Sequence, residues 1–365
     1  MIIYRRREDL SVQKPRNCGK AIFKNIWDKL NIYVDFIAVG MLKYDRKTKL
    51  YAKGGLKMKL SVLTGGYTHF FIRDICDLID YYADMGYGAL DLSLDSAYDP
   101  ELLSEKDWLM PAKRIKQKMK TRKMFFCQAH APIVSYLHNA TDDDERKLRQ
   151  CIRVCSYLGI KSLVVHLLHV KDSTPETFRE KNIEYYNRFL PMLDEYDVDI
   201  CFENYGHFLE KDSYCCSADD LLAVINGMDS THIHACWDTG HANLRRLDQY
   251  ENVTKLGDHL RAIHVHDNHY PISEPDGMFS PDAHNFPLFG NINFDSFIQA
   301  LIDIDYKNAF SIETDTPNRR GHLDFFHNGE LTLNLKPIPF KIRRKSDELL
   351  FEIGKYMLET YGLWE

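Results

Sequence analysis

From Met58 onward, short apolar runs alternate with longer amphipathic segments. Eight of the runs are rich in apolar or β-branched residues and have the length of buried strands. They cover residues 60–64, 88–92, 123–129, 162–166, 199–203, 232–238, 262–266 and 309–313. Strands that alternate with helices predict repeated βα units and a parallel sheet.

Helical periodicity lies between and after these runs. The predicted helices cover residues 71–85, 107–121, 142–158, 175–196, 218–228, 247–257, 294–304 and 346–361. Eight strands, each followed by a helix, favour a closed (β/α)₈ TIM barrel over an open doubly wound sheet, and no GxGxxG follows the first strand. Two loops, 269–291 and 314–340, are longer than ordinary connections, which makes them candidates for function.

The first 57 residues differ from the rest, because they are rich in Lys and Arg and contain one short apolar stretch, 32–42. Met58 opens the first strand as if it were an initiator, and Lys53, Gly54 and Gly55 just before it could be a translated ribosome-binding sequence. We therefore expect an N-terminal extension, 1–57, that is poorly structured or a mis-assigned start, and a barrel over 58–365. A real N-terminal arm is the alternative.

Composition narrows the class of protein. With 365 residues, 44% of them hydrophobic, the chain can bury a large core. The net charge is −6 and the basic residues beyond the N-terminal region are spread out, which predicts no nucleic-acid groove. Nine cysteines without a CxxC indicate a reducing, cytoplasmic setting, and no apolar run approaches the ~20 residues that span a bilayer.

Polar residues end six of the predicted strands, at the edge where a TIM barrel carries its active site. The strand-end residues are His130, His166, Glu203, Asp238, His264 and Glu313, with His241 and His266 close behind. One such residue alone often caps a helix or binds a loop. Together, converging carboxylates repel unless a cation lies between them, so the pattern predicts a divalent metal. The mixed oxygen and nitrogen ligands suit Mn²⁺, Zn²⁺, Co²⁺ or Mg²⁺, and the imidazole weighs against Mg²⁺ alone.

Three cysteines lie within the strands beside these residues, namely Cys127, Cys201 and Cys236. We expect them to alternate with the polar residues, to face the surrounding helices and to serve as core residues.

The motifs FEN, WDTGHAN, AIHVHDN, DAHNFPLFGNINF and SIET occur in this order at the strand ends. In this order they resemble the xylose isomerase-like superfamily, and the resemblance covers Met58 to the C-terminus. That superfamily includes sugar and sugar-phosphate isomerases and epimerases, inosose dehydratase and apurinic-site endonucleases of the endonuclease IV type. The resemblance implies one metal held by the four residues Glu203, Asp238, His264 and Glu313.

Further positions match the endonuclease members. His241 resembles a substrate contact of the epimerases or a ligand of a second metal. The other residues that match endonuclease ligands are His130, His166, Asp282 and His284. All nine positions of a three-zinc site are thus filled, but single-metal members often carry histidines at these places, so the number of ions stays open. For a sugar enzyme, we expect His130, His166 and His266 to bind substrate.

The resemblance implies a metal-dependent isomerase or epimerase that works through an ene-diolate on a sugar or sugar phosphate. Glu203 and Glu313 would then act as both ligands and bases, while His241 positions hydroxyl groups. The sequence leaves open the sugar, its phosphorylation and the choice between isomerisation, epimerisation and dehydration. It is compatible with a homo-oligomer.

Two alternatives remain. One is an endonuclease IV-like phosphodiesterase with two or three zinc ions, and the other is a sugar-binding barrel without catalysis. DNA-binding loops usually carry many basic residues, whereas the loops 130–141 and 166–172 contain one Lys and no Arg, and 269–291 contains neither. We therefore expect no nucleic-acid partner. The number of metal ions per chain would distinguish the endonuclease from the sugar enzyme. Turnover of a sugar would distinguish the sugar enzyme from the binding protein.

Overall fold

The computed structural model describes residues 55–65, 72–94, 100–205, 214–269, 282–314, 324–327, 330–334 and 338–365. All of them belong to one compact unit, Tyr51–Glu365. The predicted extension, 1–57, lies almost wholly outside the described residues. Its separation from the barrel therefore stays a prediction.

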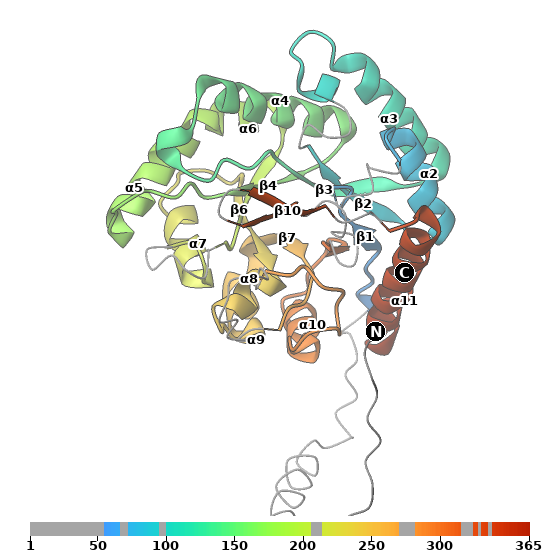
Figure 1. Ribbon diagram of the computed structural model, residues 1–365. Helices are drawn as coiled ribbons and strands as arrows, with labels where there is room; N and C mark the ends of the chain where they lie inside the picture. The colour runs from blue at the N-terminus through green and yellow to red at the C-terminus, as the bar shows by residue number, and fades with distance from the viewer. Residues whose placement is uncertain are drawn as a thin grey trace, which may run out of the picture. The chain divides into compact units, whose positions relative to one another are not determined.

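Parallel strands form a barrel at the centre of Figure 1. They are β1 Leu60–Val62, β2 Ala89–Ser93, β3 Phe125–His130, β4 Ser162–His166, β5 Asp199–Glu203, β6 Ile233–Asp238, β7 Leu260–His264 and β8 Phe310–Ile312. Strands β2 to β7 pair in sequence order, and β1 pairs with β8. Single bridges from Leu63 to Asp91 and from Val265 to Ile312 join the two sheets. The predicted TIM barrel is confirmed.

Helices surround the strands (Figure 1). They are α2 Ile75–Met85, α3 Leu109–Arg122, α4 Asp142–Leu158, α5 Pro175–Tyr186, α6 Leu190–Tyr196, α7 Ala218–Ile225, α8 Thr239–Leu244, α9 Gln249–Leu256, α10 Phe294–Asp303 and α11 Phe340–Thr360, with 3-10 turns at η3 Pro100–Leu103, η4 Leu137–Asn139, η5 Asn187–Phe189 and η6 Gly257–His259. Helix α4 illustrates the local signals. It begins with a capping box between Thr141 and Asp144 and ends at Gly159, whose φ of 81° suits glycine.

Some predicted helices differ from those observed. The segment 175–196 is not one helix but α5, η5 and α6, because Pro191 lacks the N–H that a continuous helix needs there. Helix α8 was not predicted, since its six residues are too few to show a helical period. Helix α11 begins six residues before the predicted start at 346, at a residue that directly follows Pro339.

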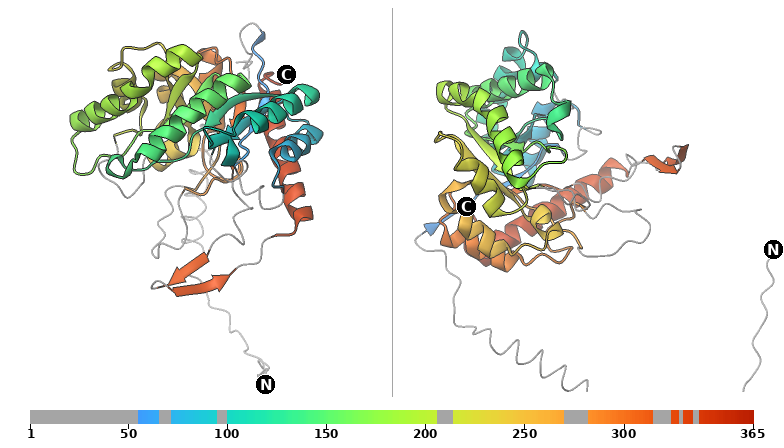
Figure 2. Two further views of the ribbon diagram at one scale, coloured as in Figure 1. Left: turned by 90° about the horizontal axis from the view of Figure 1, so that it is seen from above. Right: turned by 90° about the vertical axis from the view of Figure 1, so that its left-hand side faces the viewer.

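A β-hairpin lies within the predicted loop 314–340. Strands β9 Asp324–His327 and β10 Glu330–Asn334 pair antiparallel. In both views of Figure 2 the hairpin lies outside the ring of helices, beyond the N-terminal end of α11. The sequence Asn328-Gly329 between the strands is a strong hairpin signal that our prediction missed.

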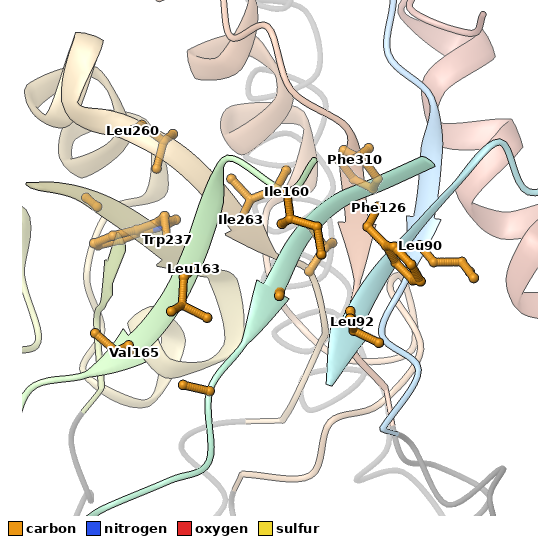
Figure 3. Close-up of a cluster of buried hydrophobic side chains, with 14 of the residues drawn as sticks. Leu90, Leu92, Phe126, Ile160, Leu163, Val165, Trp237, Leu260, Ile263 and Phe310 are labelled. Carbon is orange, nitrogen blue, oxygen red and sulfur yellow. The ribbon is translucent and has the colours of Figure 1, made fainter. Parts of the chain in front are cut away.

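The main hydrophobic core lies between strands and helices. Figure 3 shows large apolar residues from neighbouring strands, including Leu163, Trp237 and Ile263. These side chains alternate along each strand with the polar residues of the site. The alternation directs the polar set into the barrel and the apolar set toward the helices.

The cysteine prediction is wrong in one respect. Cys201 and Cys236 are buried, but they form a cluster with Val164 and Ala262 that is separate from the helix-facing core. Each cysteine stands two residues before a strand-end carboxylate and therefore shares its face of the strand. Cys127 forms a similar cluster with small residues, at an irregularity in the pairing of β2 and β3. The three thiols thus face the barrel interior.

Among the described residues, no helix combines the length and the apolar character that crossing a bilayer requires.

A shortened chain that begins at Met58 is expected to fold as the full chain does. It keeps all eight barrel strands, and the Met58 backbone N–H that donates to the Leu363 carbonyl at 2.7 Å. Of the described residues that it lacks, 55–57, only Leu56 is buried. Thermal unfolding followed by circular dichroism should show a melting temperature lower by only a few degrees. Aggregation of the shortened chain would mean that residues 1–57 are structural.

Candidate metal centre

Four strand-end residues converge at the C-terminal mouth of the barrel. Glu203, Asp238, His264 and Glu313 each place one ligand atom within 4.8 Å of the others. The first three are buried, and the Glu313 side chain is 18% exposed. The residues predicted to hold one metal therefore lie together, on strands β5, β6 and β7 and directly after β8.

The contacts of His264 fit a metal ligand. Its Nδ1 lies 3.1 Å from Glu203 Oε1 and 2.9 Å from Glu313 Oε2, yet it makes no hydrogen bond to either. Such short distances without hydrogen-bond alignment are expected of side chains that point at a common centre. On the other side of the ring, Nε2 donates to Asp91 Oδ2 at 3.2 Å. A carboxylate behind the ring fixes the tautomer that leaves Nδ1 free to bind a cation.

The two oxygens of Asp238 have different surroundings. Oδ1 accepts the backbone N–H of His241 at 2.6 Å, which caps helix α8. Oδ2 is buried and makes no hydrogen bond. A buried carboxylate oxygen without a partner is costly, and a cation would remove that cost. The residues present thus fit a divalent cation among these four side chains.

Glu203 connects this group to two further histidines. Its Oε2 lies 3.3 Å from His130 Nε2 and 3.1 Å from His166 Nε2. Its Oε1 faces His264 and also lies 3.3 Å from His241 Nδ1. The predicted residues His130 and His166 are therefore brought to the same carboxylate, on the opposite oxygen from the first group.

A third group lies beside Asp238. It consists of His241, His266, Asp282 and His284, whose ligand atoms also lie within 4.8 Å of one another. Asp282 Oδ2 lies 3.5 Å from His241 Nε2 and 3.2 Å from His284 Nε2. His241 Nδ1 contacts the Asn204 carbonyl oxygen at 3.1 Å, which directs Nε2 toward Asp282. All the residues predicted from the strand ends and the DAH motif are thus assembled at one mouth.

Burial and neighbouring charge act in opposite directions on these groups. Burial alone would raise the pKa of Glu203, but the charges of His264 and His166 hold this pKa well below its ordinary value. Burial alone would lower the pKa of His264, but the nearby glutamates raise this pKa well above its ordinary value. For His241, burial would likewise lower the pKa, whereas Asp238 and Asp282 raise it. Without a metal, the raised pKa values favour protonated His264 and His241, and their positive charges balance the buried carboxylates.

Sequence reasoning missed two residues of the centre. Asp91 on β2 contacts His264, and it also accepts a hydrogen bond from Gln128 Nε2 at 2.7 Å. Cys236 forms a candidate group with Glu203 and His264. The signal for Asp91 was a carboxylate between two leucines in an apolar strand. A buried acid at such a position usually has a charged or metal-bound partner.

Cation affinity is expected to depend on pH. A cation can bind His264 Nδ1 only after the proton held there has left, so binding releases protons. Because the pKa of His264 is raised, affinity should fall about tenfold per pH unit for each displaced proton as pH falls below it. Calorimetry of Zn²⁺ binding in two buffers of different ionisation enthalpy counts these protons. An affinity that is constant between about pH 6 and 8 would contradict this arrangement.

A comparison with models of known protein families shows to which family the chain belongs. The family described as xylose isomerase-like TIM barrel matches residues 79–331. The chain belongs to this family. The resemblance predicted from the strand-end motifs is thereby confirmed.

Curated relatives of this xylose isomerase-like chain have differing names. A probable endonuclease 4 of Methanoculleus marisnigri is 32% identical over 164 residues, which cover 41% of this chain and 55% of that protein. An inosose dehydratase of Bacillus velezensis is 25% identical over 138 residues, 35% of this chain and 44% of that enzyme. An uncharacterised protein of Methanocaldococcus jannaschii is 24% identical, over 58% of this chain and 73% of its own length. The chain thus spans about half of the two named relatives.

Solved structures share the fold. A D-tagatose 3-epimerase-like protein superposes with a TM-score of 0.60 at 20% identity, covering 84% of this chain and 98% of that one. The zinc-bound IOLI protein gives a TM-score of 0.61 at 14% identity, over 84% and 99% of the two chains. A D-psicose 3-epimerase of Clostridium cellulolyticum gives 0.61 at 13%, over 82% and 99%. At these identities the comparison supports the barrel rather than the reaction.

Proposed function

We propose that this member of the family is a metal-dependent isomerase or epimerase of a sugar or sugar phosphate. One observation carries the proposal: two glutamates, Glu203 and Glu313, come from different strands and both approach His264 Nδ1, within 3.1 and 2.9 Å. They thus lie at the edge of one candidate cation position. Epimerases are among the solved structures that share this fold.

A divalent cation bound there would polarise a substrate carbonyl, so that the neighbouring C–H becomes acidic. Glu203 and Glu313 would remove that proton and return one. Without a cation, positively charged imidazoles outweigh the effect of burial and hold the pKa values of both carboxyl groups below their ordinary values. A bound cation would supply this positive charge in their place and keep both groups in the basic form. His241, at the start of α8, would orient the substrate hydroxyls.

Histidines at the neighbouring strand ends would complete the substrate site. His130 and His166 contact Glu203 Oε2, and His166 stacks on Tyr205 with ring centroids 4.6 Å apart. Imidazole N–H groups and an aromatic face suit the hydroxyls and the apolar face of a sugar. The paucity of Lys and Arg in the strand-end loops favours a small substrate over a nucleic acid.

The test is exchange of the substrate's α-hydrogen with deuterated solvent. Metal-reconstituted protein would be incubated with a panel of ketoses and their phosphates, and products would be analysed by NMR and mass spectrometry. We expect deuterium at one carbon of one substrate, together with conversion to an isomer or epimer. Absence of both exchange and conversion across the panel, in protein that holds its cation, would refute the proposed reaction.

A second candidate is an apurinic-site endonuclease with two or three zinc ions. It is favoured by the three ligand groups that converge on Glu203 and Asp238, and by the 32% identity to a probable endonuclease 4. Elemental analysis and a cleavage assay on abasic DNA separate the two. Three zinc ions with strand cleavage would support the endonuclease, whereas one or two cations with sugar turnover would support the isomerase.

A further inference from the structure

The last helix, α11, presents large apolar side chains to solvent. Ile342 is 49% exposed, Leu349 is 47% exposed and Tyr356 is 61% exposed. They stand seven residues apart, so they follow one another along one side of the helix, and we call them the apolar line of α11. A single exposed apolar residue is ordinary, whereas apolar residues at a seven-residue spacing are typical of a helix that packs against a second helix.

The other side of α11 is already occupied by the barrel. Leu350 and Leu358 are buried in the main core. Arg343 and Asp347 form a buried ion pair at 2.7 Å, and Asp347 also accepts a hydrogen bond from the Tyr81 hydroxyl of α2 at 2.8 Å. These contacts fix the side of α11 that faces the barrel. The apolar line therefore stays on the outside, where Figure 1 shows α11 at the edge of the ring beside α2.

The exposed charges of α11 are segregated along the helix. The first half carries the exposed cations and the second half carries the exposed anions, namely Lys341, Arg344 and Lys345 against Glu348, Glu352 and Glu359. Lys355, 3.9 Å from Glu359, is the exception. The first turn has no acidic residue and the last turn has no basic residue. This order is the reverse of the one that the helix macrodipole favours, so the helix by itself does not explain it.

A second copy of α11, packed antiparallel, is complementary to both features. With Leu349 opposite Leu349 of the other copy, Ile342 lies opposite Tyr356, because each is seven residues from the centre. Lys345 and Glu352 stand four residues before and three residues after that centre, so they approach each other across the two helices. A two-fold axis needs a surface that is complementary to itself in this way. A parallel pair would instead bring Lys345 against Lys345.

We propose that the apolar line of α11 is a dimer interface, in which two copies of this chain pack with their α11 helices antiparallel. The inference goes beyond the proposed function, because α11 carries none of the candidate ligands. Both mouths would keep a complete site. One helix about 30 Å long contributes a small interface, which is typical of weak assemblies, so we expect a dissociation constant on the order of 1–100 μM.

The first experiment is sedimentation velocity of the full chain between about 1 and 200 μM. We expect a shift from monomer to dimer over this range. Leu349→Asp would place two carboxylates face to face at the two-fold axis and should weaken the dimer about 100-fold or more. Met110→Asp makes a similar change at an exposed apolar residue of α3, and this control should leave the dimer unchanged. Circular dichroism verifies that each variant is folded.

Charge reversal tests the antiparallel arrangement. Lys345→Glu and Glu352→Lys should each weaken the dimer roughly 3–30-fold, because each replaces an attraction by a repulsion at two symmetric places. The double variant should recover the original affinity. A monomer at every concentration, or a folded Leu349→Asp variant that dimerises as before, would overturn the interface. A double variant weaker than both single variants would overturn the antiparallel packing.

Discussion

Glutamine in place of Glu203 or Glu313 is expected to lower turnover by about 10²–10⁴-fold while the cation stays bound. Gln keeps the size of the side chain and one oxygen ligand but cannot take up a proton. If the two carboxylates serve as separate bases, each variant should impair α-hydrogen exchange more from one stereochemical direction than from the other. Rates of exchange for both epimers, measured by NMR in deuterated solvent, give the comparison.

Glu195→Gln, on the exposed surface of α6, is the control for this pair and should leave exchange unchanged. This variant makes the same Glu-to-Gln change at a position far from the mouth of the barrel. Equal and mild effects of both site variants in the two directions would mean that Glu203 and Glu313 are ligands only. Metal content must be measured in each variant, so that loss of a base is not confused with loss of the cation.

Removal of a ligand on β6 or β7 is expected to abolish stoichiometric cation binding and leave the fold largely intact. His264→Ala removes the nitrogen nearest to both glutamates, and Asp91 keeps its hydrogen bond from Gln128. Asp238→Ala would also remove the cap of α8, at a cost of about 0.5–2 kcal/mol in stability. Asp238→Asn retains a capping oxygen and isolates the loss of the charge.

Elemental analysis after dialysis, together with thermal unfolding, measures both consequences. The control is Asp219→Asn, an exposed acid that pairs with Lys255 on the surface, where an ion pair contributes little. Full retention of the cation in both the His264 and the Asp238 variants would show that the metal ligands lie elsewhere. Collapse of the fold in Asp238→Asn would assign that residue a structural role instead.

The strands could be predicted because each is a short apolar run with flanking turn residues. Each of the eight predicted strands overlaps an observed one, and β4 and β5 have the predicted bounds. The observed bounds of a strand differ from the predicted ones where the apolar run and the strand pairing do not end at the same residue. Strand β7, for example, begins at Leu260 rather than at 262. There, the irregular pairing with β6 between Ala235 and Cys236 decides the register, and no local signal reports it.

The candidate site was predictable in part because barrel topology brings all strand ends to one mouth. Six residues from separate strands could therefore be placed together before their contacts were known. The close packing of His266 could not be foreseen, because it depends on the absence of a side chain at Gly240 in helix α8. Asp91 likewise belongs to the site only through its contact with His264, which lies 173 positions further along the chain.

The pairing of β1 with β8 has a consequence for how the protein is made. Ser61 stands opposite Ser311, 250 positions later, so the first strand has no partner on that side until nearly the whole barrel has left the ribosome. At about 5–20 residues per second this wait lasts on the order of 10–50 s. Glu313 directly follows β8, so the last carboxylate reaches the mouth only as the ring closes. A cation held by all four predicted ligands would therefore bind only after this C-terminal part of the barrel has left the ribosome.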